Sequence, residues 1–216
     1  MGDSNQFSIV QSNLALVQEP ILEVGSRLYG DRTDLRSLFP GRTYLGADLE
    51  PGPGVDAVID FTEHVAEIKR KLGYDSFGTI ICFSVLEHCA QPFDMAKNIT
   101  ALLRPAGTLF VSVPFVWNIH AYPNDYWRFT AEGVQMLFPD IQFDVCLMST
   151  TRPGEVHPFE DRQFALKVKH VHGLRRRVLR LCVSIARKLG TLPAYGYSYL
   201  FPPILINMIG RKGAAE

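Results

Sequence analysis

The sequence predicts an α/β fold: a doubly wound, Rossmann-like sheet of seven strands, mostly parallel with an antiparallel last strand. From Pro20 onwards, short apolar runs alternate with amphipathic segments, which is the pattern of strand–helix–strand crossover units. The first apolar run ends in a glycine turn, as it does in sheets that bring the backbone close to a ligand. A length of 216 residues suits one such domain with an appendage and is too short for two full domains.

The expected strands lie at Ile21–Val24, Thr43–Ala47, Ala57–Ile59, Thr79–Phe83, Thr108–Val113, Ile141–Leu147 and Arg162–Val168. The expected helices lie at Asp31–Leu38, Thr62–Leu72, Pro92–Leu103 and Thr130–Leu137. Pro92 suits the first turn of its helix, and Thr130 suits an N-cap. Residues 1–19 are expected to form a leading helix, and the Pro/Gly/acid-rich residues 149–161 a loop. We therefore expect a lead-in at 1–19, a domain at 20–170 and a C-terminal extension at 171–216.

The composition is that of an ordinary globular protein, with 47% hydrophobic and 20% charged residues. It excludes disordered, collagen-like and disulfide-scaffold classes. The net charge of zero conceals a division of sign. Residues 1–161 carry 11 basic and 21 acidic side chains, a net charge of −10, whereas residues 162–216 carry 11 basic and one acidic side chain, a net charge of +10. An acidic main domain argues against nucleic acid as a partner.

The four cysteines show neither a CxxC pair nor metal-site spacing, and the opening residues MGDSNQFSIV lack the features of a secretory signal. We therefore expect a reduced, cytoplasmic location. The longest apolar stretch, Ala194–Gly210, contains Pro202, Pro203 and Asn207. It is shorter than the roughly 20 residues that a membrane-spanning helix needs, so no such helix is expected.

The glycine turn after the first strand is centred on Gly25. It is not a GxGxxG fingerprint, because Arg27 stands where the second glycine belongs. Asp48 ends the next strand, 23 residues after Gly25, where an acidic side chain holds ribose hydroxyls in nucleotide-binding sheets. The alternatives are a turn that binds nothing and an aspartate that only caps its strand, but the combination favours ribose binding.

An ordered series of segments carries a family resemblance: Glu23-Val-Gly25, Asp48, VIDFTE at 58–63, FSVLEH at 83–88 and LLRPAGTLFVSVPF at 102–115. In order and spacing, the series resembles the motifs of class I S-adenosylmethionine-dependent methyltransferases over about residues 20 to 150. The resemblance implies a Rossmann-like fold, S-adenosylmethionine as cofactor and transfer of a methyl group.

For the methionine portion of the cofactor, the resemblance implies contacts from Glu23, Gly25, Ser26 and Gly30. The residues between them, RLY at 27–29, are bulkier than the usual glycine-rich turn of this family. S-adenosylmethionine has no pyrophosphate, so one permissive glycine suffices. Its cationic sulfonium also tolerates a nearby carboxylate such as Glu23, which would repel a pyrophosphate.

For the nucleoside portion, the resemblance implies that Asp48 and Leu49 hold the ribose and that Asp60 and Phe61 meet the adenine. Phe83 and Ser84, at the end of the fourth strand, resemble the positions that close over the cofactor from below.

The catalytic groups are expected in the segment Val113–Thr130, directly after the fifth strand. Methyl transfer to a hydroxyl needs a base, and His120 is the leading candidate because imidazole titrates near neutral pH. Asp125 would orient His120, act as the base itself or join it in a metal site. A metal is not expected, and loop-structural roles for both residues stay open. His88, beside Glu87, is expected to be structural or to lie on the cofactor side.

The same segment supplies candidates for acceptor binding: Tyr122, Tyr126, Trp127 and Arg128. Tyr122 and Trp127 would stack on a sugar or an aromatic ring, and Arg128 would pair with an anionic group. The alternative is a hydrophobic plug beneath the loop. The run DYWRFT resembles a segment of bacterial methyltransferases that act on glycans and small molecules, which implies O-methylation of such an acceptor.

The C-terminal residues His172–Gly190 show apolar side chains at helical spacing with arginines largely outside that stripe, which predicts a basic amphipathic helix. Residues 172–210, which include this helix, would contact an anionic membrane surface. Alternatively, the helix would pack on the domain or on a second subunit in a homodimer. Two other functions are alternatives: a catalytically silent adaptor that acts through this tail, and a nicotinamide-dependent oxidoreductase, which the missing GxGxxG motif disfavours.

Overall fold

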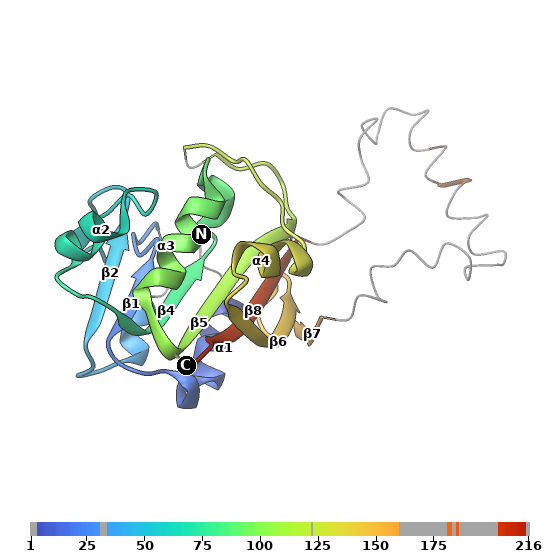
Figure 1. Cartoon of the computed structure of the whole chain (residues 1–216). Coiled ribbons are helices and arrows are strands. Elements are labelled where there is room, and N and C mark those ends of the chain that lie inside the picture. Colours follow the sequence, from blue (N-terminus) through green and yellow to red (C-terminus); the bar gives the residue numbers. More distant parts are fainter. Residues whose placement is uncertain are drawn as a thin grey trace.

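The computed structural model describes residues 4–30, 34–121, 123–159, 181–182, 185 and 203–214. One eight-stranded sheet runs through the centre, in the strand order β3-β2-β1-β4-β5-β8-β6-β7 (Figure 1). The strands are β1 Ile21–Val24, β2 Tyr44–Asp48, β3 Ala57–Val58, β4 Phe77–Phe83, β5 Leu103–Val116, β6 Ile141–Ser149, β7 Val156–Pro158 and β8 Ile204–Lys212. The helices are α1 Ser4–Ser12, α2 Val65–Leu72, α3 Pro92–Leu102 and α4 Ala131–Leu137, with 3₁₀ turns η1 Leu14–Leu16, η2 Leu35–Leu38 and η3 Leu86–His88.

Strands β1 to β5 pair in parallel, whereas β8 is antiparallel to both β5 and β6, and β7 is antiparallel to β6. The Rossmann-like, mostly parallel sheet with an antiparallel last strand is therefore confirmed. The chain leaves β1 towards β2 on one side and later returns to β4 on the other. This reversal makes a switch point, and ligands of open α/β sheets bind in the crevice outside the carboxyl ends of the strands at such points.

The last strand, β8, is built from residues 204–212, which were expected to belong to the C-terminal extension. Residues 204–210 are all buried because the strand lies between β5 and β6. This end of the chain therefore belongs to the sheet and cannot serve as a membrane anchor.

The strand expected at 162–168 lies outside the described residues. The expected loop at 149–161 contains β7, so the described sheet has eight strands rather than seven.

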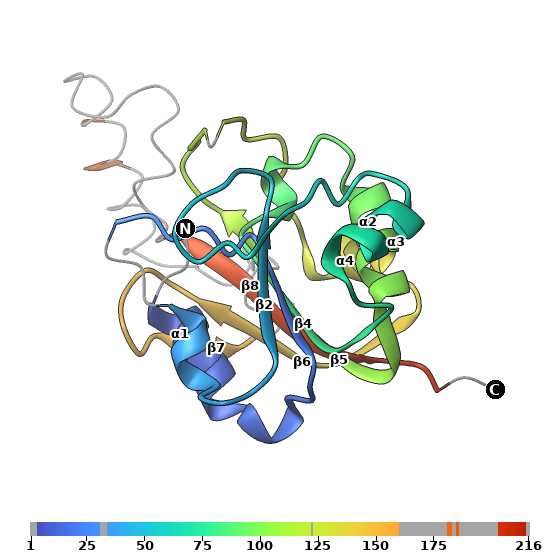
Figure 2. The ribbon, with the colours of Figure 1, turned by 90° about the vertical axis from the view of Figure 1, so that its left-hand side faces the viewer.

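Helices cover both faces of the sheet (Figure 2). Helices α2, α3 and α4 pack on one face, and α1 lies on the other. Neighbouring strand residues alternate between the two cores: Leu22 and Ile80 belong to the first, and Ile21 and Ile81, with Ile9 of α1, belong to the second. Burial on both faces explains why these strands read as continuous apolar runs.

The helix ends follow the local chemistry of the sequence. Pro92 occupies the first turn of α3, where its missing N–H is not needed. The Thr130 hydroxyl caps α4 by accepting a hydrogen bond from the Gly133 amide. In the predicted helix Asp31–Leu38, the described part is only the short turn η2, where the Asp34 side chain accepts a hydrogen bond from the Arg36 amide. The turn η2 and helix α1 both contribute to the second core on this face of the sheet, through Leu35 and Ile9.

Of the predicted basic helix at 172–190, only residues 181, 182 and 185 are described; they are helical, and Leu181 and Ile185 are exposed. The rest of that prediction lies outside the described residues. None of the helices in the described ranges combines the length and apolar character that a membrane crossing requires. All four cysteines are described, and all are free thiols.

Candidate functional site

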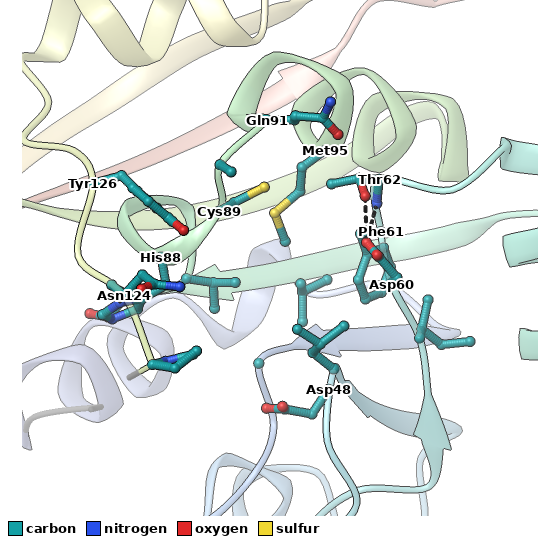
Figure 3. Close-up of a pocket in the computed structure, with 18 of the residues that line it drawn as sticks. Asp48, Asp60, Phe61, Thr62, His88, Cys89, Gln91, Met95, Asn124 and Tyr126 are labelled. Atoms are coloured by element: carbon teal, nitrogen blue, oxygen red, sulfur yellow. Dashed lines mark hydrogen bonds between the residues drawn. The ribbon is translucent and has the colours of Figure 1, made fainter. Parts of the chain in front are cut away.

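A cavity of about 380 Å³ opens at the carboxyl edge of the parallel strands. Its walls come from the ends of β1, β2 and β4, the segment after β3, the turn η3, the start of α3 and residues 123, 124 and 126 (Figure 3). The cavity thus lies at the switch point between β1 and β4, where a doubly wound sheet places its ligand.

Gly25 lines the cavity at the end of β1 with a φ of 79°. A Cβ atom at this position would lie 2.2 Å from Cγ2 of Val85. Only glycine combines this backbone conformation with so close a neighbour. The Gly25 amide donates a 2.8 Å hydrogen bond to the Ala47 carbonyl, which ties the turn to β2.

Two carboxylates line the same cavity from adjacent strand ends, as Figure 3 shows. Asp48 accepts hydrogen bonds from the amides of Arg27 at 3.1 Å and Glu50 at 3.2 Å. The turn after β1 and the turn after β2 therefore both orient its carboxylate. Asp60 accepts from the Thr62 amide at 2.8 Å and from the Thr62 hydroxyl at 2.6 Å, both through Oδ1. Leu49 and Phe61, the predicted neighbours of these acids, also line the cavity.

Three predicted cofactor residues do not line the cavity: Glu23, Ser26 and Gly30. Glu23 is buried in the sheet, where its carboxylate accepts a 2.5 Å hydrogen bond from the Tyr44 hydroxyl. Ser26 is buried against Gly46 of β2. Tyr29, from the bulky part of the turn, lines the cavity instead, with the Arg27 guanidinium 5.0 Å from the centre of its ring.

Phe83 and Ser84 line the cavity at the end of β4, where Ser84 adopts a φ of 54°. A positive φ is uncommon for a residue with a side chain. The Ser84 amide donates to the Ser112 carbonyl at 2.8 Å, and its hydroxyl accepts from the Gln6 amide group at 3.1 Å. Gln6 also donates to the Ser112 hydroxyl at 2.8 Å and is only 1% exposed. Helix α1 therefore supports the strained serine from behind.

The segment after β5 is held by a polar group of three side chains: His120, Asp125 and Arg128. Arg128 makes a two-point ion pair with Asp125, at 2.5 Å to Oδ1 and 2.7 Å to Oδ2, and this pair holds the pKa of Asp125 well below its usual range. Asp125 Oδ2 also accepts from the His120 amide at 2.8 Å and lies 3.3 Å from His120 Nδ1. Arg128 further donates to the carbonyls of Trp127 and Asn118. None of these three side chains lines the cavity.

The predicted acceptor-binding aromatics have different positions. Tyr126 lines the cavity and is half exposed. The indole N–H of Trp127 donates to the Cys89 carbonyl at 2.9 Å, and its ring lies outside the cavity, near Phe129. Tyr122 lies outside the described residues.

Behind the cavity wall, Glu87, His88 and His120 form a cluster. Glu87 is 1% exposed, and neither of its carboxylate oxygens has a hydrogen-bond partner among the described residues. Burial raises the pKa of Glu87 to about 7. His88 lines the cavity, and the rings of His88 and His120 meet edge to face with their centres 4.9 Å apart. Burial lowers the pKa of His88.

The motifs of the sequence could not identify several lining residues: Cys89 and Gln91 between η3 and α3, Met95 in α3, and Pro123 and Asn124. No sequence pattern indicated that Gln6 supports the cavity wall, because this role depends on hydrogen bonds to Ser84 and Ser112, which lie 78 and 106 residues away. The FSVLEH run at 83–88 did contain the signal for His88, since its position after β4 is close to the switch point.

No family model and no curated protein matches the chain. Solved structures do. A [4+2]-cyclase, SpnF, aligns with 98% of this chain and 82% of its own at 15% identity, with a TM-score of 0.57. The N-methyltransferase NodS from Bradyrhizobium japonicum, solved with S-adenosylhomocysteine, aligns with 97% of this chain and 85% of its own at 11% identity, with a TM-score of 0.54. A SAM-dependent methyltransferase from Anabaena variabilis aligns with 98% and 86% at 12% identity, also with a TM-score of 0.54.

The chain has the fold of the class I S-adenosylmethionine-dependent methyltransferases. This confirms the fold that the motif series predicted. A methyltransferase fold does not determine the reaction, because a cyclase and an N-methyltransferase are both among the similar structures. The reaction has to be argued from the cavity of this chain.

Proposed function

We propose that this protein is an S-adenosylmethionine-dependent methyltransferase that methylates a hydroxyl group of a saccharide or another small molecule. The observation that carries the proposal is the presence of Asp48 and Asp60 in one cavity beside the Gly25 turn. Carboxylates are suitable acceptors for the two ribose hydroxyls and for the adenine amino group. Asp48 would hold the ribose, and Asp60 with Phe61 would hold the adenine.

The charge of the cavity supports this cofactor over a dinucleotide. Its described lining includes Asp48 and Asp60 but no lysine or arginine. A pyrophosphate would meet two carboxylates without a countercharge, whereas a sulfonium cation is attracted by them. The turn also lacks the second glycine that a pyrophosphate-binding loop needs, since Arg27 stands there.

The acceptor would bind on the side of the cavity formed by His88, Asn124 and Tyr126, away from Asp60 and Thr62 in Figure 3. An in-line displacement requires the acceptor oxygen, the methyl carbon and the sulfur to be aligned there. Because a hydroxyl must lose a proton during transfer, the histidines on this side favour a hydroxyl acceptor. His120 remains the proposed group for activating that hydroxyl, with Asp125 orienting it and His88 between it and the cavity.

Calorimetric titration of the full chain with S-adenosylmethionine, S-adenosylhomocysteine and NAD tests the cofactor. We expect binding of the two sulfur compounds and none of NAD. A screen for S-adenosylhomocysteine release, with sugars, other alcohols and amines as acceptors, then tests the reaction. Turnover with amines alone would overturn the hydroxyl specificity, and NAD binding without either sulfur compound would overturn the proposal itself.

A further inference from the structure

The cluster behind the cavity wall contains the donor set of a metal centre. We infer that Glu87, His88 and His120 bind one divalent transition-metal ion of the zinc class at the acceptor side of the cavity. We infer the binding of the metal from the geometry of these three residues. Only its catalytic role rests on the function proposed above.

The first argument is the convergence of ligand atoms. One carboxylate oxygen and one ring nitrogen from each histidine lie within 4.8 Å of one another. Zinc binds imidazole nitrogen and carboxylate oxygen at about 2.0 to 2.2 Å, so ligands of one ion lie up to about 4 Å apart. Small side-chain rotations therefore close the site. The three residues come from η3 and from the segment after β5, so the fold, and not one local motif, brings them together.

The second argument is the orientation of the rings. His88 Nδ1 lies 2.6 Å from the Asn124 carbonyl oxygen, which can only accept, so Nδ1 carries the proton and Nε2 carries the lone pair. That Nε2 lies 3.9 Å from Oε1 of Glu87. His120 Nδ1 likewise faces the Asn118 carbonyl at 3.2 Å and Asp125 at 3.3 Å. Metal-binding histidines are oriented in this way, by donating the other N–H to a carbonyl or a carboxylate.

The third argument is the state of Glu87. Its side chain is buried, and both of its oxygens lack a hydrogen-bond partner among the described residues. A buried carboxylate without a partner is unfavourable, and buried charges are normally paired or bound to a metal. A cation between Glu87 and the two histidines would satisfy this group. This observation is independent of the distances within the cluster.

The donor set determines the class of ion. Two imidazoles and one carboxylate suit zinc and related transition metals, whereas Mg²⁺ prefers oxygen ligands. Three protein ligands leave a fourth position open, as in catalytic zinc sites. Since His88 lines the cavity, the open position would be accessible to an acceptor hydroxyl.

In this arrangement, His120 activates the acceptor by holding the metal and not by taking the proton, because its lone pair is bound to the ion. The metal-bound hydroxyl loses its proton to water. The new oxygen–methyl bond then forms as the sulfur–methyl bond breaks, and the sulfonium leaves as neutral S-adenosylhomocysteine.

The test is a titration of the full chain, stripped of metal by a chelator and dialysed, with Zn²⁺ by calorimetry and with Co²⁺ by visible absorption. We expect one ion per chain and Co²⁺ bands of low coordination number. Glu87→Gln, which preserves the size of the side chain, His88→Ala and His120→Ala should each weaken binding by about 100-fold or more. Mg²⁺ should not compete at equal concentration.

Two control variants remove histidines outside the cluster. His157→Ala removes an exposed imidazole, and a variant with both His170→Ala and His172→Ala removes a closely spaced pair. Both should bind Zn²⁺ like the wild type. Absence of wild-type binding, or equal binding by Glu87→Gln, would overturn the inference.

S-adenosylhomocysteine titration of every variant shows whether its cavity is intact. It also separates this inference from the proposed function. If the chain binds S-adenosylhomocysteine but not Zn²⁺, the metal site alone is refuted. If it binds Zn²⁺ through the cluster but neither sulfur compound, the cofactor proposal is refuted and the metal site stands.

Discussion

The side-chain amide of Gln6 donates a 2.8 Å hydrogen bond to the hydroxyl of Ser112, which lies 106 residues further along the chain. The same amide group reaches the Ser84 hydroxyl at 3.1 Å. Ser84 lines the cavity, so the Gln6 side-chain amide links helix α1 to the cavity wall. The neighbouring Asn5 binds the backbone of residues 150, 152 and 154. Helix α1 is thereby bonded to Ser84 and Ser112, at β4 and β5, and to the turn between β6 and β7.

Gln6→Ala should destabilise the fold, because it removes both hydrogen bonds and leaves two buried hydroxyls without this donor. We expect a loss of about 1 to 3 kcal/mol in the free energy of unfolding, measured by denaturant titration. Gln11→Ala, at an exposed position of the same helix, is the matched control and should change stability by less than about 0.5 kcal/mol. Equal stability of the two variants would show that α1 does not support the sheet edge.

Asp48→Asn should weaken binding of S-adenosylhomocysteine by about 10-fold or more, since a hydrogen bond to a charged group is worth about 1.5 to 3 kcal/mol. The Arg27 amide donates to Oδ2 of Asp48 and the Glu50 amide to Oδ1, so asparagine, with one oxygen, retains one of these two bonds and loses the other. Asp48→Ala should weaken binding further. Asp144→Asn, at an exposed position on β6, should bind normally. Unchanged affinity of Asp48→Asn would exclude Asp48 as the ribose ligand.

Asp125→Asn should be less stable than the wild type at neutral pH, and the difference should shrink in acid. The ion pair with Arg128 lowers the pKa of Asp125 in the folded state. Its contribution to stability is therefore present above the unfolded pKa of about 3.9 and is lost as the pH falls through the folded value. Denaturant titrations between pH 7 and pH 3 measure this. A constant difference across the range would show that the ion pair does not stabilise the segment.

Alkylation of the cysteines should report occupancy of the cavity. Cys182 is exposed, Cys89 is partly buried and lines the cavity, and Cys82 is fully buried. Burial raises the pKa of both Cys82 and Cys89, which lowers their thiolate content. Mass spectrometry should therefore find fast modification of Cys182, slow modification of Cys89 and none of Cys82. Saturating S-adenosylhomocysteine should slow Cys89 alone. Full reactivity of Cys89 in the complex would place the ligand elsewhere.

Local patterns in the sequence were sufficient for the parallel half of the fold. Apolar runs bounded by turns located β1 to β5, and Pro92 and Thr130 marked the starts of α3 and α4 correctly. The pattern was less informative at the other edge. The apolar run that forms β8 resembles any other buried segment, and only its pairing with β5 and β6 shows that it completes the sheet.

The sequence by itself determined that Gly25, Asp48 and Asp60 end or follow consecutive apolar strands, because apolar runs and a glycine turn are encoded over short distances. Only the tertiary structure decided that Glu23 faces Tyr44, that the Trp127 indole donates to the Cys89 carbonyl, and that His120 converges with Glu87 and His88. Side-chain direction and pairing depend on neighbours that are distant in the chain. No local pattern of charge or hydrophobicity specifies them before the chain folds.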